Sequence, residues 1–207
     1  MKIIIGLGNP EKEYEGTRHN VGFFFADKIK SQWNFPEFEM NKKLNSLVSK
    51  HSILLLPSGE DAQRADEGKM DEKEILLVKP QTFMNLSGEA TKNILDFYKL
   101  TSEDIIVIHD DLDIAIGKYR IATDSSSAGH NGVQNLIEKL GTQKFKRIRI
   151  GIGAEDKISE PDAHLPRQSC PTAAEAGDFV LQKFSPEELE KIEKISDAVL
   201  KEIEKIL

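Results

Sequence analysis

The chain has 207 residues, of which 39% are hydrophobic and 30% charged, and its net charge is −7. This length suits one domain with a sizeable core. No run of about 18 apolar residues is present for a membrane helix, and the start lacks the apolar core of a signal peptide. The single Cys170 excludes an internal disulfide framework and a thiolate zinc cluster. We therefore expect a cytoplasmic globular protein with no membrane partner.

The negative charge is concentrated in two segments. Residues 57–74 hold seven acidic and three basic side chains, and residues 155–178 hold six acidic and two basic ones. Residues 115–150 show the opposite balance, with seven basic and two acidic side chains. A basic run is often only a solvated surface, but it can also hold phosphate groups. The charge pattern leaves room for nucleic-acid binding at this basic zone.

The first twenty residues predict a buried strand and a polar loop. Ile3-Ile4-Ile5 is too apolar for a half-exposed strand, so we expect residues 2–7 in the centre of a sheet. Gly6-Leu7-Gly8-Asn9-Pro10 follows, but Glu11 stands where a G-x-G-x-x-G nucleotide motif needs glycine. The chain then reaches Thr17-Arg18-His19-Asn20 and a helical pattern, with Asn20 as the expected N-cap.

The next part of the chain predicts a hairpin, a loop and a helix. Leu47–Leu56 and Ile75–Lys79 have the composition of strands, joined by an acidic hairpin insert at 57–74. Gln81–Gly88 forms a loop, in which Ser87 is expected to cap a helix that continues to residue 100.

Two further strands and a helix are expected in the second half. The apolar strand 105–108 ends in polar residues, His109-Asp110-Asp111-Leu112-Asp113, and residues 117–122 form the following strand. His130-Asn131-Gly132 leads into a helix that ends at Leu140, with Gly141 as a left-handed cap. Basic and apolar residues alternate over Arg147–Ile152, which predicts a strand with one face in water.

The C-terminal part predicts a loop and a long helix. Residues 154–178 combine many charges with no periodicity, which indicates a lid-like loop. Ser185-Pro186-Glu187-Glu188 is a capping box with proline at the first helical position. Because strands and helices alternate, we expect an α/β fold. The prediction is a single-domain three-layer α/β/α sandwich, residues 1–207, around a mixed, largely parallel twisted sheet.

Polar side chains follow several predicted strands, where open α/β sheets bind ligands. They are Asn9 with His19, Asn85, His109 with Asp110, and His130 with Asn131. If these groups converge, a histidine can activate water while a carboxylate fixes its tautomer. Side-chain amides can then orient a carbonyl or hold oxyanion charge. The motif G-x-S-x-G is absent, so direct attack by water is favoured over a covalent intermediate.

Each of these features has a structural alternative. His19-Asn20 at a helix start is more often a cap than a catalyst. Asp110-Asp111-x-Asp113 resembles a Mg²⁺ or Ca²⁺ cluster, but it lacks the glycine and distal glutamate of a calcium loop. Aspartates that form a turn are the commoner explanation. No H-E-x-x-H pair supports zinc, so we expect no metal and no cofactor.

Six ordered segments together resemble the successive motifs of the bacterial peptidyl-tRNA hydrolase family. The segments are Gly6-Leu7-Gly8-Asn9-Pro10 with Tyr14, Thr17-Arg18-His19-Asn20, Lys79-Pro80-x-Thr82-Phe83-Met84-Asn85-x-Ser87-Gly88, His109-Asp110-Asp111-Leu112-Asp113, Gly129-His130-Asn131-Gly132 and Arg147-Ile148-Arg149-Ile150-Gly151-Ile152-Gly153. The resemblance implies an esterase that releases the peptide from peptidyl-tRNA after ribosomal drop-off. It also implies a monomer that works without a cofactor or metal.

The resemblance assigns a role to each matching residue. His19 would be the general base, Asp110 would keep it competent, and Asn9 would contact the substrate. Asn85 and Asn131 would hold the peptide main chain and position the water. The remaining assignments place Tyr14, Phe83 and Met84 at the binding cleft and Arg120 and Arg149 on the tRNA 5′ phosphate. Arginine suits phosphate because its donors form a planar fork.

The chain departs from the family pattern in a few places. Glu11 and Ser125-Ser126-Ser127-Ala128 stand where the family usually has glycine, and the acidic segments are unusual. The acidic lid-like loop should repel a phosphate backbone. Two alternatives stay open: a non-catalytic RNA-binding relative of the same fold, and a hydrolase of small esters or amides. Overall acidity supports the second alternative, and Arg120 and Arg149 contradict it.

Overall fold

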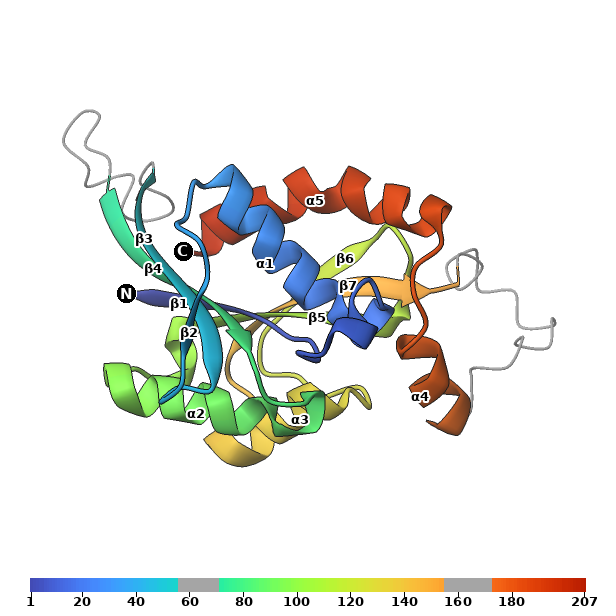
Figure 1. Ribbon diagram of the computed structural model, residues 1–207, viewed down its shortest axis with the longest axis horizontal. Helices are drawn as coiled ribbons and strands as arrows, with labels where there is room; N and C mark the ends of the chain where they lie inside the picture. Colours follow the sequence, from blue (N-terminus) through green and yellow to red (C-terminus); the bar gives the residue numbers. More distant parts are fainter. Residues whose placement is uncertain (56–70, 155–172) are drawn as a thin grey trace.

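A mixed β-sheet forms the centre of the protein (Figure 1). The computed structural model describes residues 1–55, 71–154 and 173–207. Within these residues the sheet has seven strands in the order β2-β3-β4-β1-β5-β7-β6. The strands are β1 (Lys2–Gly6), β2 (Glu39–Asn41), β3 (Ser46–Leu55), β4 (Asp71–Pro80), β5 (Ile105–Ala115), β6 (Tyr119–Ala122) and β7 (Lys146–Gly153).

Parallel pairing is confined to the middle of the sheet. β1 pairs in parallel with β4 on one side and β5 on the other, and β5 pairs in parallel with β7. β2, β3 and β6 are added in antiparallel pairings. The prediction of a central first strand is confirmed, and the sheet is mixed as expected. Because the four central strands point the same way, the loops after them meet at one edge of the sheet.

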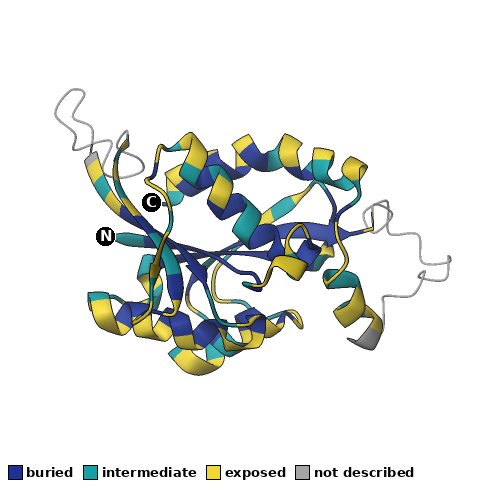
Figure 2. Ribbon diagram, viewed as in Figure 1, coloured by how far each residue is buried: buried dark blue, intermediate teal, exposed yellow. Residues whose placement is uncertain are grey.

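Helices cover both faces of the sheet. They are α1 (Val21–Gln32), α2 (Ser87–Tyr98), α3 (Asn131–Leu140), α4 (Ala173–Val180) and α5 (Pro186–Ile206). α1 and α5 lie on one face, whereas α2 and α3 lie on the other (Figure 1). The buried side chains separate into one core beneath each helix pair, and Figure 2 shows buried and exposed residues alternating along α1, α2, α3 and α5. The three-layer architecture of the α/β prediction is therefore the observed one.

Glycines let α1 approach the sheet closely. A Cβ on Gly22 would lie 2.4 Å from the backbone nitrogen of Leu7 and 2.5 Å from the carbonyl oxygen of Ile108. A Cβ on Gly6 would lie 2.2 Å from the carbonyl oxygen of Gly22. The start of α1 therefore rests directly on the ends of β1 and β5, and it brings the preceding residues to the edge where the parallel strands end.

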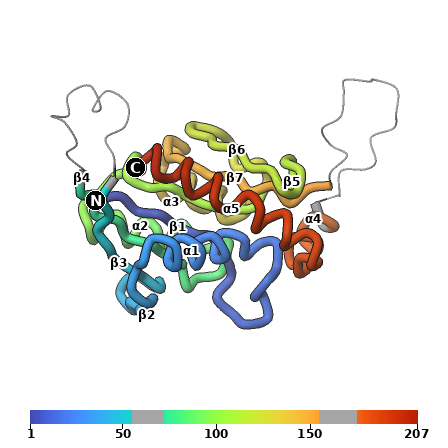
Figure 3. The backbone as a smooth tube through the Cα atoms, turned by 90° about the horizontal axis from the view of Figure 1, so that it is seen from above, coloured from blue at the N-terminus to red at the C-terminus, as the bar shows by residue number. Residues whose placement is uncertain are grey.

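The helix ends follow the sequence signals in two cases. Ser185 and Glu188 form the predicted capping box of α5, with the Glu188 backbone nitrogen donating to Ser185 Oγ at 3.2 Å. Gly141 ends α3 with a φ of 67°, a left-handed conformation that favours glycine. Figure 3 shows α5 running back across the sheet, so that both chain termini lie at the same end of the molecule.

Two predicted helix caps are wrong, for a common reason. Asn20 precedes α1, but its side chain makes no capping hydrogen bond. Ser87 is the first residue of α2, and its hydroxyl donates to the carbonyl oxygen of Met84 at 2.9 Å. A 3₁₀ turn precedes each helix and continues directly into it, so neither side chain caps the helix: Asn20 binds the backbone of Asn9 and Ser87 binds its own turn.

Two strand predictions also need correction. The strand expected at 105–108 is longer, because β5 includes the polar residues His109 to Asp113 and continues to Ala115. Arg147 of β7 was expected on a wet face, but it is only 1% exposed. Its guanidinium donates to the carbonyl oxygens of Ser125 and Ser126, so it anchors the loop that covers this part of the sheet.

The C-terminal ends of the two predicted acidic segments belong to a strand and a helix. Residues 71–74 of the predicted hairpin insert form the start of β4, and Leu55 pairs with Asp71 across the antiparallel ladder. Residues 173–178 of the predicted lid-like loop belong to α4. The rest of both segments, 56–70 and 155–172, lies outside the described residues. Over the residues that are described, no helix has the length and apolar character needed to cross a membrane.

The close approach of α1 gives a stability prediction. Gly22→Ala should lower the free energy of unfolding by about 1–3 kcal/mol, because the new Cβ meets backbone atoms that cannot move aside. Gly177→Ala is the matched control, since no atom lies within 4 Å of its Cβ position in α4. The control should be neutral or slightly stabilising. Urea unfolding measures both variants, and equal stabilities would contradict the packing described here.

Candidate active site

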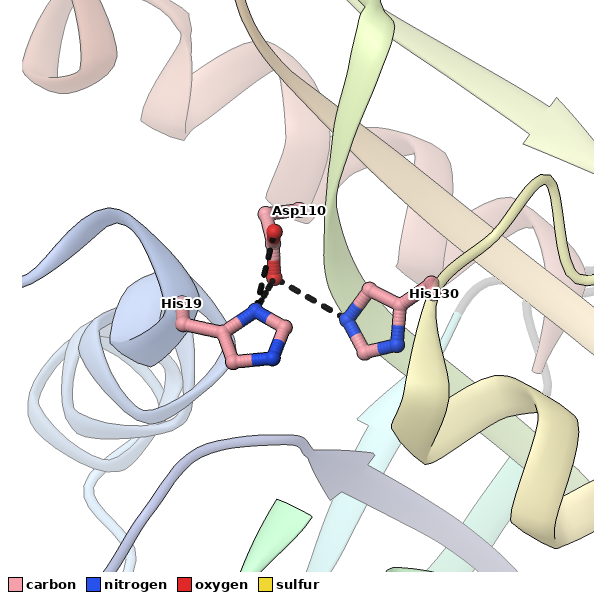
Figure 4. A group of neighbouring side chains, drawn as sticks. All are labelled: His19, Asp110 and His130. Carbon is pink, nitrogen blue, oxygen red and sulfur yellow. Dashed lines mark hydrogen bonds and ion pairs between the residues drawn. The ribbon is translucent and has the colours of Figure 1, made fainter. Parts of the chain in front are cut away.

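Asp110 lies between two histidines at the edge where the parallel strands end (Figure 4). Nδ1 of His19 lies 2.9 Å from Oδ1 and 3.0 Å from Oδ2 of the carboxylate. Nε2 of His130 lies 3.0 Å from the same Oδ1 atom. The three side chains are between 3% and 8% exposed. The residues come from distant parts of the sequence, so the fold is what creates this cluster.

Each member of the cluster is held by a different element. Asp110 extends from β5, and His19 lies in the 3₁₀ turn Arg18–Asn20 just before α1. His130 is the N-cap of α3, where its Nδ1 accepts a hydrogen bond from the Val133 backbone nitrogen at 3.2 Å. Since Nδ1 accepts, the proton of His130 is on Nε2 and points to Asp110. Capping therefore fixes the tautomer of this histidine.

The contact with Asp110 also fixes the tautomer of His19. A carboxylate can only accept, so Nδ1 of His19 carries the proton and Nε2 keeps its lone pair. Burial lowers the pKa of His19, but the charge of Asp110 and the hydrogen bond outweigh burial and leave this pKa above its ordinary value. His19 is therefore a strengthened base whose free nitrogen points away from Asp110 (Figure 4).

The histidines keep Asp110 ionised. Burial raises the pKa of a carboxyl group, but the charges and hydrogen bonds of His19 and His130 hold the pKa of Asp110 far below its usual range. Asp110 is thus a fixed negative charge inside the protein. Such a charge stabilises an imidazolium when His19 takes up a proton.

His109 completes the cluster from behind. Its Nδ1 donates to the carbonyl oxygen of Asp110 at 2.7 Å, and its ring contacts the ring of His130 edge to face at 4.7 Å. Burial and the neighbouring His130 hold the pKa of His109 well below its usual value, so the ring is neutral. Its Nε2 has no hydrogen-bond partner among the described residues. His109 supports the backbone of Asp110 without adding charge.

Asn9 links the loop after β1 to two neighbouring segments. Asn20 brackets the Asn9 backbone, accepting from its nitrogen at 2.8 Å and donating to its carbonyl oxygen at 3.0 Å. The Oδ1 atom of Asn9 accepts from the Met84 backbone nitrogen at 2.8 Å. Because Oδ1 faces Met84, the NH₂ group of the Asn9 amide points away from Met84 and can donate to another partner. The loop with Asn9 is therefore rigidly connected to the turn with His19.

The loop before α2 meets the start of α3 beside these residues. A Cβ on Gly132 would lie 2.5 Å from Sδ of Met84 and 3.1 Å from Cε1 of His130, so glycine permits this contact. Met84 is buried. Phe83 and Asn85, on either side of Met84 in the sequence, are exposed, and so is Asn131, which precedes Gly132. The structure brings them to the same edge of the sheet as His19.

Two arginines form a basic row on the neighbouring strands. Arg149 of β7 pairs with His109 of β5 on one side and with Arg120 of β6 on the other. Strands are spaced about 4.8 Å apart, so the row begins one strand from the histidine cluster. Arg149 is half-buried and its Nε donates to Oδ2 of Asp111 at 2.5 Å, whereas Arg120 is exposed. Ile148 and Ile150 face the core under α1 and α5, so Arg149 points to the opposite face.

Tyr14 lies apart from these contacts. It is half-buried in the turn Lys12–Tyr14, and no hydrogen bond or ring contact within the described residues joins its side chain to His19, Asp110 or Asn9. A hydrogen bond with Glu13 and the nearby charges raise the pKa of Tyr14. Of the predicted site residues, Tyr14 is the one whose part in the site the geometry supports least.

The cluster has the composition of a metal site, so the fit of an ion must be considered. His19, Asp110 and His130 place their donor atoms within 4.8 Å of one another. A tetrahedral zinc ion with bonds of about 2.0–2.1 Å separates its ligands by roughly 3.3 Å. The separations from Asp110 are 2.9 and 3.0 Å, which are ordinary N–H···O hydrogen-bond lengths. The geometry fits hydrogen bonds better than shared coordination.

The aspartates of β5 bind side chains of the protein, whereas the sequence suggested either an ion cluster or a turn. Asp110 and Asp111 are consecutive residues of a strand, so they point to opposite faces and cannot form one ion cluster. Asp110 binds the histidines, and Asp111 binds Arg149. Both aspartates are buried in β5, and Asp111 also accepts a hydrogen bond from the Asp113 backbone nitrogen at 2.9 Å, where the strand becomes irregular.

Sequence reasoning missed the roles of His130 and Asn20. His130 was placed near the site, but its direct bond to Asp110 depends on the orientation of α3. Asn20 was read as a cap, although it binds Asn9. Gly132, two residues after His130, was a usable signal, because glycine inside a first helical turn often marks a close approach.

A comparison with protein families identifies the chain. A model of the family described as peptidyl-tRNA hydrolase matches residues 3–207. The chain belongs to the peptidyl-tRNA hydrolase family. Peptidyl-tRNA hydrolase from Bacillus subtilis is 40% identical over 205 residues, which cover 99% of this chain and 90% of the relative. The Brevibacillus brevis protein of the same name is 47% identical over 152 residues, covering 73% of this chain and 70% of the relative.

Solved structures agree with the family assignment. A crystal structure of peptidyl-tRNA hydrolase from Acinetobacter baumannii matches with a TM-score of 0.77 at 26% sequence identity. The match covers 100% of this chain and 88% of that chain. The fold and the resemblance in the sequence motifs therefore lead to the same family.

The electrostatics of the cluster predict how His19 titrates. In Asp110→Asn the attraction for the imidazolium is lost while burial remains, so the pKa of His19 should fall below that of the parent. NMR titration of the imidazole measures this shift. Asp113→Asn is the control, because Asp113 is exposed on the same strand and should leave the His19 titration unchanged. An unchanged or raised pKa in Asp110→Asn would contradict the assignment.

Proposed function

We propose that this protein hydrolyses the ester bond between peptide and tRNA in peptidyl-tRNA, with His19 as the general base. The family assignment supports the reaction. The observation that carries the mechanism is the pair of His19 and Asp110, in which the carboxylate holds Nδ1 and leaves Nε2 as a free base. An ester needs only an activated water for hydrolysis, and this pair supplies the activation.

The proton balance of the reaction follows from the tautomer of His19. Nε2 takes a proton from water while the water oxygen attacks the ester carbonyl carbon. Asp110 stabilises the imidazolium through Nδ1–H and stays ionised throughout. When the tetrahedral intermediate collapses, Nε2–H gives the proton to the ribose oxygen that leaves. The products are a peptide carboxylic acid, which ionises in solution, and a tRNA with a free ribose hydroxyl.

The side-chain amides supply polar contacts for the substrate. The NH₂ group of Asn9 is the part of that side chain not bound to Met84, so it is available as a donor to a carbonyl oxygen. Asn85 and Asn131 are exposed on the two loops that meet at Gly132, where they can bind the peptide main chain. Exposed Phe83 offers an apolar surface beside them, Met84 lies beneath it, and Tyr14 has a more distant place in the cleft.

The basic row suits the 5′ phosphate of the tRNA. Arg120 and Arg149 are like charges directly opposite each other on paired strands, an arrangement that an anion would relieve. Asp111 occupies Nε of Arg149, and within the described part of the chain the terminal Nη1 and Nη2 groups remain for a phosphate. Arg149 is in register with His109, whose ring contacts that of His130, so the row lies beside the histidine cluster and one substrate can reach both. The acidic overall charge then makes this row the favoured place for the nucleic acid.

The remaining assignments complete the proposal. One chain supplies the whole histidine network, so we propose a monomer in which residues 1–207 act as a single domain. The mechanism uses no metal or cofactor, because the network activates water by itself. A substrate made on the ribosome supports a cytoplasmic location. A non-catalytic RNA-binding relative would not need His19 and Asp110 in contact, which disfavours that alternative.

The proposed reaction can be tested directly. The protein should release the blocked amino acid from an N-acetylated aminoacyl-tRNA in the presence of a chelator, and the unblocked ester should react much more slowly. His19→Ala should lower kcat by about 10²-fold or more, because the general base is lost, while tRNA binding persists. Acid-precipitable radioactivity follows the reaction. If the blocked ester stays intact, the proposed function is wrong, and near-normal kcat in His19→Ala would refute the base.

The proposed phosphate contact can be tested by tRNA binding. Arg149→Ala should weaken tRNA binding and reduce the slope of log K against log salt by about 1, as expected for one lost phosphate contact. Lys201→Ala is the matched control, because this exposed lysine lies on α5 across the sheet. Fluorescence anisotropy at several salt concentrations measures both slopes. Identical slopes in the two variants would rule out Arg149 as a phosphate ligand.

A further inference from the structure

Arg18, the residue directly before His19, is held by the C-terminal part of the chain. Its side chain is buried, and Nη2 donates to both carboxylate oxygens of Glu188 at 2.8 Å. Nη1 donates to the carbonyl oxygens of Gln182 at 3.3 Å and Lys183 at 3.2 Å. The two terminal nitrogens of the guanidinium are thus committed to a segment more than 160 positions away in the sequence.

The backbones of the same two segments are also joined. The Arg18 nitrogen donates to the Gln182 carbonyl oxygen at 3.0 Å, and the Phe184 nitrogen donates to the Gly16 carbonyl oxygen at 3.1 Å. Thr17 and Lys183 form an antiparallel bridge between these bonds. Residues 16–18 therefore add a short ladder to the connection between α4 and α5.

Glu188 connects this ladder to the start of α5. Its carboxylate accepts from the Ser185 backbone nitrogen at 2.8 Å in the capping box and binds Arg18 at the same time. Burial raises the pKa of Glu188, but the bonds from Arg18 and Ser185 outweigh burial and lower it overall. The Arg18 guanidinium also lies 4.2 Å above the ring of Phe179 in α4. Arg18 is therefore packed against both C-terminal helices.

The turn with His19 is consequently fastened at both of its ends. Asn20 binds the backbone of Asn9 on one side of His19, and Arg18 binds Glu188 on the other. If the Arg18–Glu188 contact is removed, the backbone ladder still joins the two segments, but no side chain fixes the turn on this side and the position of His19 is less constrained. A shift of about 1 Å in such a group is enough to cost on the order of 10²-fold in rate.

We infer that Arg18 and Glu188 form a clamp that positions the His19 imidazole against Asp110. Arg18 and Glu188 are positioning residues, because their polar contacts are with the protein and they act through His19. One terminal nitrogen of Arg18 binds the Glu188 carboxylate while the other binds two backbone carbonyl oxygens, and the single ammonium nitrogen of a lysine cannot make both sets of contacts. The catalytic consequence of the clamp rests on the proposed function of His19, whereas its structural consequence does not.

Glu188→Gln is the sharpest test. The glutamine amide oxygen can still accept from the Ser185 nitrogen, so the cap of α5 remains while the charge that binds Arg18 is lost. We expect kcat on N-acetylated aminoacyl-tRNA to fall by on the order of tenfold or more, with KM changed by no more than about twofold. Arg18→Lys, the conservative change on the other side of the clamp, should show a smaller loss of the same kind.

A titration without substrate separates the clamp from the reaction. NMR titration of His19 should show a lower pKa in Glu188→Gln than in the parent, because a displaced imidazole interacts less with Asp110. Ser185→Ala is the matched control, since it weakens the same helix cap without removing the Arg18 contact. The control should lower the melting temperature and leave both the His19 titration and kcat unchanged.

The outcomes discriminate between the possible explanations. If Glu188→Gln lowers only the melting temperature, with kcat and the His19 titration unchanged, the pair is merely structural and the inference is wrong. An equal change of the titration in Ser185→Ala would also overturn it, because the helix start rather than the clamp would then position His19. Since the titration needs no substrate, it tests the clamp even if the parent protein releases no peptide, a result that would refute only the proposed function.

Discussion

The structure depends on a buried negative charge. Asp110 is 3% exposed, and an ionised carboxylate at such a position is costly unless donors surround it. His19 and His130 provide the donors, and His109 fixes the backbone from behind. The hydrogen bond from His19 helps to stabilise the buried charge of Asp110, and it also fixes the orientation of the His19 imidazole. One contact therefore serves both the stability of the fold and the proposed chemistry.

This arrangement explains why the site lies where it does. β5 continues beyond its apolar residues, so it carries Asp110 to the edge where the loops after the central parallel strands meet. α1 reaches that edge because Gly22 allows helix and strand backbones to touch, and α3 begins there with His130 as its cap. The basic row on β7 and β6 continues from the same strand register. The sheet thus carries Asp110, Arg149 and Arg120, and the starts of α1 and α3 bring His19 and His130 to Asp110.

Much of the fold could be predicted from the sequence, because local patterns determine it. Ile3-Ile4-Ile5 marks a central strand, the capping box at Ser185 marks a helix start, and Gly141 marks a helix end, and each is found as expected. The errors occur where tertiary contacts override local preference. Asn20 binds Asn9 instead of capping α1, and Arg147 is buried because it anchors a neighbouring loop. The pairing of His19 with Asp110 followed from a family resemblance, but the contact of His130 depends on helix placement, which no local pattern contains.

The central claim is that His19, strengthened by Asp110, is the base that activates water. The pH dependence of kcat/KM on N-acetylated aminoacyl-tRNA tests it most directly, because this profile reports the pKa values of the free enzyme. The account predicts an acid limb that rises with pH, with a midpoint above the ordinary histidine value of about 6.5 and equal to the midpoint of His19 in the NMR titration. A profile without an acid limb, or with a midpoint that differs from the His19 titration, would contradict the account.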